Sequence, residues 1–73
     1  MDYSINVAEI EELQDLRDRE ALLFILDKAR RSIIQGAEVF LYRKTNQGQK
    51  AYFDTIHSES ELEAYKNQVL KYL

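Results

Sequence analysis

The chain has 73 residues, a net charge of −3 at pH 7 and no Cys. This size predicts one domain, over residues 1–73, and the lack of Cys excludes a disulfide framework, a thiolate nucleophile and the usual zinc sites. The longest apolar run, residues 21–26, is much shorter than the roughly 20 residues that cross a bilayer, and no basic stretch precedes it. We therefore expect a cytoplasmic protein without membrane contact or cofactor.

Charge is segregated along the chain. Residues 1–27 carry eight acidic side chains against two basic ones, and residues 28–50 carry six basic side chains against Glu38 alone. Opposite fields on one small body favour head-to-tail contacts between copies, so we expect self-association on assembly. The plain alternative is a surface of mixed, solvated charges.

Two helices, or one long one, are predicted before residue 36. Asn6 can cap a helix that begins at Val7, and Ile5 can pack on Ile10 as a hydrophobic staple. The apolar stripe changes phase near residues 17–19, which predicts either two helices, over residues 7–16 and 19–35 with Asp18 as the second cap, or one long helix that serves two different partners. Gly36 ends the helix in either case. Residues 1–18 are expected to be an acidic helical extension of a core formed by residues 19–73.

A β-hairpin and a final helix follow. The stretch around residues 39–43 alternates with period two, residues 45–48 supply a turn, and residues 49–56 form the returning strand. Ser58 and Glu61 make a capping box for a helix over residues 59–72, whose apolar stripe includes Leu62, Tyr65 and Val69. The predicted fold class is α+β, with two helices packed on a two-stranded antiparallel sheet.

The hairpin is expected to carry the contact residues. If Val39, Leu41, Ala51 and Phe53 face the helices, the opposite side of the hairpin presents an aromatic patch. That patch consists of Phe40, Tyr42 and Tyr52. Either the N-terminal helix or a neighbouring protein should cover it. A second set, Arg43, Lys44 and Lys50, is expected near the hairpin tip as DNA-facing or electrostatic contacts.

Catalytic chemistry is not expected. The only His, His57, stands directly ahead of the capping Ser58, where a structural or surface role is predicted. The two Gly residues, Gly36 and Gly48, serve a helix end and a turn and cannot form a phosphate loop. No metal site, cofactor or catalytic residue is predicted.

From residue 19 to residue 73 the chain resembles the head-completion protein W family of tailed bacteriophages. The matching features are a helix that closes on Gly36, a strand with Val39, and a second strand that carries Lys50 before aromatic residues. The last helix opens with Ser-Glu-Ser-Glu-Leu, residues 58–62, followed by Tyr65. Residues 1–18 are an addition to the family pattern, and the family's C-terminal tail is missing.

The resemblance implies a non-enzymatic protein that assembles as a ring beneath the portal of a filled head. Its partners would be the portal or other connector proteins, with non-specific contact to the packaged DNA, in the host cytoplasm and the virion. Two other functions stay open. One is a small adaptor or inhibitor that binds a partner protein through the aromatic hairpin face or the acidic first helix. The other is a weak nucleic-acid binder that uses the basic middle of the chain.

Overall fold

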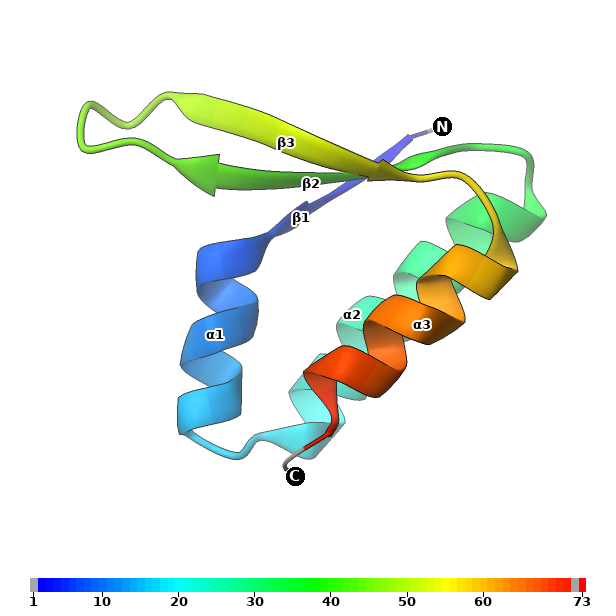
Figure 1. Cartoon of the computed structure of the whole chain (residues 1–73), viewed down its shortest axis with the longest axis horizontal. Helices are drawn as coiled ribbons and strands as arrows, with labels where there is room; N and C mark the ends of the chain where they lie inside the picture. Colours follow the sequence, from blue (N-terminus) through cyan, green and yellow to red (C-terminus); the bar gives the residue numbers. More distant parts are fainter. Residues whose placement is uncertain (1, 72) are drawn as a thin grey trace.

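A computed structural model describes residues 2–71 and residue 73 of the chain. The elements follow the order β1 (Tyr3–Asn6), α1 (Val7–Asp15), α2 (Arg19–Ile34), β2 (Val39–Lys44), β3 (Lys50–Ile56) and α3 (Glu59–Val69). The three strands form one layer, and the three helices lie together on one side of it (Figure 1). We call the side of the sheet toward the helices the inner face and the opposite side the outer face.

The sheet has three strands in the order β1-β2-β3 and is mixed. β1 runs parallel to β2, with Ile5 opposite Leu41, and β2 runs antiparallel to β3, with Val39 opposite Ile56. The α+β class is confirmed, but the expected two-stranded sheet under two helices is wrong in detail. The strand β1 has only four residues and is followed directly by α1. Its last two residues, Ile5 and Asn6, match the pattern of a helix start, so the strand was not predicted.

The helix boundaries follow local capping. The Asn6 side chain accepts a hydrogen bond from the Ala8 amide, and the Asp18 side chain accepts one from the Ala21 amide, each satisfying a free N–H of a first turn. Arg17 has φ 54°, a left-handed conformation that interrupts the helical backbone between α1 and α2. Of the two predicted alternatives, two helices are therefore confirmed and one long helix is not.

The end of α2 and the start of α3 also lie where the sequence predicts. Gly36 has φ 91°, a conformation that closes a helix without the strain a Cβ would add. Ser58 Oγ accepts a hydrogen bond from the Glu61 amide at 3.2 Å, which caps α3. The helix ends at Val69, before the predicted bound, and Tyr72 lies outside the described residues.

The core lies between the inner face and the helices and draws on all six elements. Its buried members are Ile5, Ile10, Leu22, Leu26, Ala29, Val39, Leu41, Ile56, Leu62 and Val69. Because Ile5 and Ile10 are each 2% exposed, the segment expected as an extension supplies a strand and a helix to the same core. α1 packs on the inner side with the other helices, so it does not cover the aromatic patch (Figure 1).

Candidate interaction surface

The outer face of the sheet carries three aromatic rings in contact. Strand alternation directs Phe40 and Tyr42 away from the helices, and Tyr52 stands directly opposite Tyr42 on β3. The Tyr52 ring centroid lies 6.2 Å from that of Phe40, edge to face, and 5.5 Å from that of Tyr42. Phe40 and Tyr42 are half-buried, and Tyr52 is 55% exposed. These three residues, predicted together from the sequence, form one patch that we call the aromatic patch.

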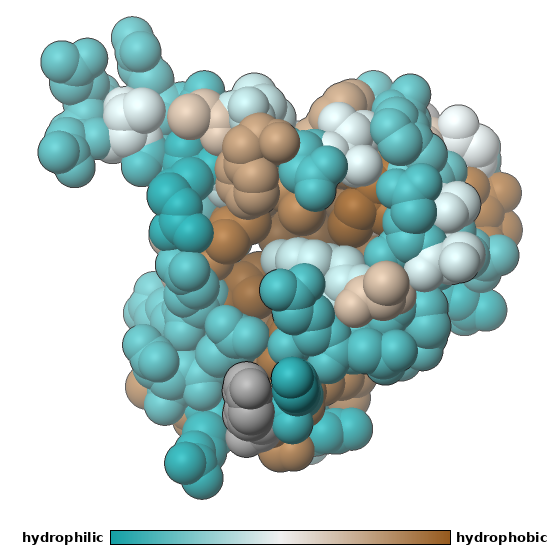
Figure 2. All heavy atoms as spheres, viewed as in Figure 1, coloured by the Kyte–Doolittle hydropathy of each residue, from teal (hydrophilic) through white to brown (hydrophobic). Residues whose placement is uncertain are grey.

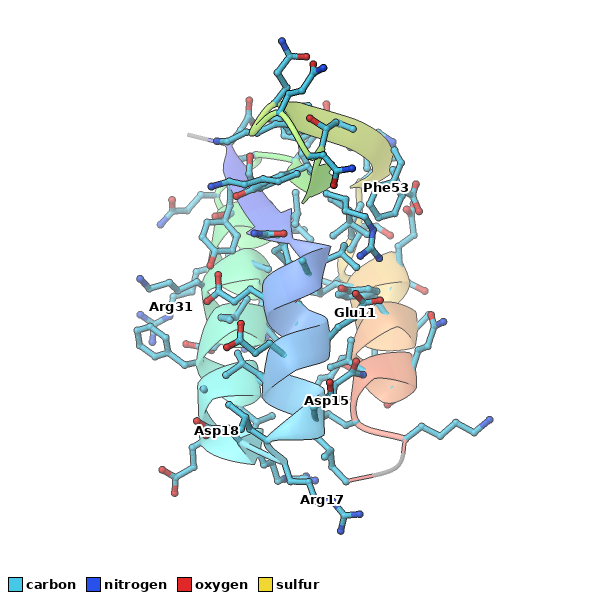
Figure 3. The ribbon with its side chains drawn as sticks, turned by 90° about the vertical axis from the view of Figure 1, so that its left-hand side faces the viewer. Glu11, Asp15, Arg17, Asp18, Arg31 and Phe53 are labelled. Carbon is cyan, nitrogen blue, oxygen red and sulfur yellow. The ribbon has the colours of Figure 1, made fainter. Side chains whose placement is uncertain are left out.

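A β-bulge sets which residues of β3 join this patch. The register shifts between Leu41 and Tyr42, so that Leu41 pairs with Asp54 whereas Tyr42 pairs with Tyr52. Phe53 is the extra residue and lies 58% exposed at the edge of the sheet (Figure 3). Of the two β3 residues expected to face the helices, Ala51 pairs with Arg43 on the inner side but is exposed, and Phe53 is the bulge residue and does not belong to the core. A bulge adds one residue without a pairing partner, and simple alternation cannot detect it.

The three predicted cations do not form one cluster. Lys44 pairs with Lys50 at the hairpin tip, on the same face as the aromatic patch, and Lys50 Nζ lies 4.9 Å from the Tyr42 ring centroid. Arg43 points to the inner side, where its guanidinium donates to both carboxylate oxygens of Glu11 at 2.8 and 3.1 Å. That bidentate hydrogen bond lowers the pKa of Glu11 and raises the pKa of Arg43.

Other cations of the basic middle are paired in the same way. Arg30 contacts Glu59 at 3.3 Å, and Arg31 contacts Asp27 at 3.0 Å on the solvent side of α2 (Figure 3). Together with the Arg43 pair, they partly cancel within one molecule the charge segregation seen along the sequence. Such exposed pairs contribute little to stability. Among the described residues of the basic middle, no ion pair is formed by Lys28, Lys44 or Lys50. Lys28 Nζ lies 4.7 Å from the Phe24 ring centroid on α2, so Lys44 and Lys50 are the two of these cations that lie on the outer face.

The opposite end of the outer face is acidic. The Asp2 carboxylate accepts a hydrogen bond from the Glu38 amide at 3.3 Å, and the Glu38 carboxylate lies 3.0 Å from Nδ1 of His57. Asp2 and Glu38 directly precede β1 and β2, and the hydrogen bond from the Tyr3 amide to the Glu38 carbonyl continues the pairing to them. When the alternation is extended by this one residue, Asp2 and Glu38 fall on the same side as Phe40. Sequence reasoning missed this end because Asp2 and Glu38 are distant in the chain and meet only through the pairing of β1 with β2.

A hollow with a hydrophobic floor opens between the hairpin and the helices (Figure 2). Leu41 and Ile56 form its floor, and polar side chains from β3 and α3 surround it, with Tyr65 beside them. Burial, with a smaller effect of the Glu11 charge, raises the pKa of Tyr65. Residues 2–71 and 73 contain no cluster of three or more His, Cys, Asp or Glu side chains suited to a metal ion. None of their helices has the length and apolar character needed to span a membrane.

Comparison of the chain with known protein families, with curated proteins and with solved structures found no match. We therefore infer function from the residues themselves. The feature that stands out is the outer face, with lysines at one end, aromatic rings at the centre and acidic groups at the other end.

Proposed function

We propose that this chain is a non-enzymatic assembly protein of the bacteriophage head-completion W type, which contacts its partners through the outer face of the sheet. The observation that carries the proposal is a helix, hairpin and helix arrangement whose sheet has helices on one face only. Sheets are normally covered on their apolar side, and an aromatic patch left uncovered is typical of a contact surface.

The residues that carry the family resemblance have structural roles that support the proposal. Gly36 ends α2 in a left-handed conformation, Ser58 caps α3, and Leu62 is 5% exposed in the core. Tyr65 is half-buried and packs against that core. These residues fix the end of α2, the start of α3 and part of the contact between α3 and the core.

The elements β1 and α1, which are additional to the family pattern, limit which residues of the hairpin could contact a partner. Because Glu11 of α1 holds Arg43, the two of the three predicted DNA-facing cations that are left for contact with packaged DNA are Lys44 and Lys50 at the hairpin tip. Of the acidic side chains on α1, Glu11 is engaged by Arg43. The aromatic patch is the better surface for the portal or another connector protein.

The test is genetic and is made in the phage or prophage that encodes the chain. Interruption of the reading frame should yield DNA-filled heads that do not join tails, as seen by electron microscopy. Wild-type protein supplied from a plasmid should restore infectious particles, and the double variant Tyr42→Ala, Tyr52→Ala should not. Phe24→Ala provides the control, because Phe24 is an exposed aromatic residue on α2, away from the outer face. Normal particle yield without the protein would refute the proposal.

A small adaptor or inhibitor is the second candidate, and the same observation favours it. An aromatic patch serves a host or regulatory protein as well as a connector. Genes for a portal or a large terminase beside this one favour the connector. The adaptor is favoured if no such genes are present and if one partner protein is pulled down by the wild-type chain but not by the Tyr42→Ala, Tyr52→Ala variant.

A further inference from the structure

The outer face is polarised along its strands. At the hairpin tip it ends in Lys44 and Lys50, and at the other end in Asp2 and Glu38, with the aromatic patch between them. His57 Nδ1 lies 3.0 Å from the Glu38 carboxylate at the acidic end. The face is thus complementary in charge to a copy of itself turned end to end. This property concerns the free protein and holds whether or not the chain is a phage connector.

We propose that a second copy of this chain packs against the outer face, related by a two-fold axis that lies between the two faces and runs across the strands. This rotation places the lysines of each copy over the acidic end of its partner and brings the two aromatic patches together. Sheets pack face to face at about 10 Å with their strands roughly aligned, which suits rings of this size. A two-fold axis along the strands would instead place lysine over lysine, which costs energy.

A second copy fits the face better than a polyanion does. A nucleic-acid strand laid along the outer face would meet Lys44 and Lys50 but then run over Asp2 and Glu38, whose charges repel phosphate. Another copy satisfies both ends at once. The two-fold contact is also closed, so it yields a dimer and does not extend into fibres.

The dimer should be weak. β2 has six residues and the sheet three strands, so the face measures roughly 20 Å by 15 Å. Interfaces of this extent lie at or below the small end of stable complexes. We expect a dissociation constant of roughly 0.1 to 1 mM, which leaves the face accessible when a tighter partner is present.

The first experiment uses the unmodified protein. Amide and aromatic NMR spectra are recorded from about 0.02 to 2 mM, a range chosen to bracket that dissociation constant, together with sedimentation equilibrium. Concentration-dependent shifts should gather on Phe40, Tyr42, Tyr52 and the two charged ends, and should weaken with added salt. A strictly monomeric protein at the highest concentration, or shifts confined to the helices, would overturn the proposal.

Charge reversal tests the pairing of the ends. Lys44→Glu with Lys50→Glu makes the face wholly acidic, and Asp2→Lys with Glu38→Lys makes it wholly basic. Each variant alone should bind itself at least about tenfold more weakly than wild type does, and an equal mixture should form heterodimers at least as tight as the wild-type dimer. Wild-type circular dichroism confirms that each variant folds. A mixture that stays monomeric contradicts the proposal.

Cross-linking fixes the orientation, and the absence of native Cys makes introduced thiols unique. A short bismaleimide should join Lys44→Cys to Glu38→Cys in a mixture and should not join two copies of Lys44→Cys. The opposite result would support a two-fold axis along the strands, with lysine over lysine, and would reject the proposed axis across the strands. If single-stranded DNA shifts the same residues of a protein that stays monomeric, the occupant is a polyanion and the proposal fails.

Discussion

The two faces of the sheet are built from the same strands and have opposite properties. On the inner face Val39, Leu41 and Ile56 are at most 4% exposed and belong to one hydrophobic core with residues of all three helices. On the outer face Tyr52 of β3 is 55% exposed. The ring contacts described for it are with Phe40 and Tyr42 of the same sheet. Period-two alternation thus divides the strands into one set of residues that stabilises the fold and another that is available for binding.

The comparison explains why a small protein can leave aromatic rings exposed. A two-stranded hairpin is marginally stable in water. Here β1 adds a third strand beside β2, and the three helices cover the inner face, so the fold is stabilised without any cover on the outer face. The outer face is therefore not needed to close the core. Its residues are free to be selected for contact.

Ile5 and Ser4 offer the largest test of this division, because they are adjacent on β1 and face opposite sides. Ile5→Ala should reduce the free energy of unfolding by about 2 to 5 kcal/mol, since it removes a fully buried side chain and leaves a cavity. Ser4→Ala should change it by less than about 0.5 kcal/mol. Both are measured by urea denaturation. Similar small losses for both would show that β1 is not part of the core.

Deletion of Phe53 tests whether the bulge alone sets the outer face. Without Phe53 the alternation along β3 is regular and Tyr52 still lies opposite Tyr42, so the loss of stability should be less than about 1 kcal/mol. Nuclear Overhauser contacts between the Tyr42 and Tyr52 rings should persist. Deletion of Phe40 from β2 is the matched control, because it turns Leu41 to the outer face and should unfold the protein.

High pH should destabilise the inner side of the molecule. Burial raises the pKa of Tyr65 above its ordinary value of 10.0, and burial, followed by the charge of Glu9, does the same for Tyr3. A tyrosine whose pKa is raised in the folded state contributes its full stabilisation below pH 10, the pKa of the unfolded state. That contribution to the free energy of unfolding is lost as the pH rises through the pKa of the folded state. The double variant Tyr3→Phe, Tyr65→Phe should therefore show a flatter decline of unfolding free energy above pH 10 than wild type. An unchanged decline would contradict the stated cause.

The sequence predicted those parts of the fold that depend on local chemistry. The caps Asp18 and Ser58, the helix end at Gly36 and the hairpin all follow from side chains that act within a few residues of themselves. The strand β1 could not be predicted, because a four-residue strand is defined by its pairing with β2, more than 30 residues away, and not by its own pattern.

The candidate surface divides in the same way. The aromatic patch was predictable, because alternation places Phe40 and Tyr42 on one face of β2, and Tyr52 joins them through the register of β3. The pairing of Arg43 with Glu11 was not, since it depends on where α1 packs beneath the hairpin. The acidic end was missed for the same reason, and with it the polarity of the face. Long-range packing, unlike capping, leaves no signal in a short window of sequence.

The smallest effect is expected from the Glu11–Arg43 pair, which lies on the inner side but is exposed to solvent. The hydrogen bond from Arg43 lowers the pKa of Glu11 below its ordinary value of 4.5, so the pair stabilises the fold above that value. The contribution is lost as pH falls through the lowered pKa. Glu11→Gln should therefore lower the melting temperature slightly at pH 7 and not at pH 2, and added salt should reduce the difference. Glu12→Gln, on the same helix and without such a partner among the described residues, is the control. A loss that is equal at pH 7 and pH 2 would mean that packing of the Glu11 side chain, rather than its charge, connects α1 to the hairpin.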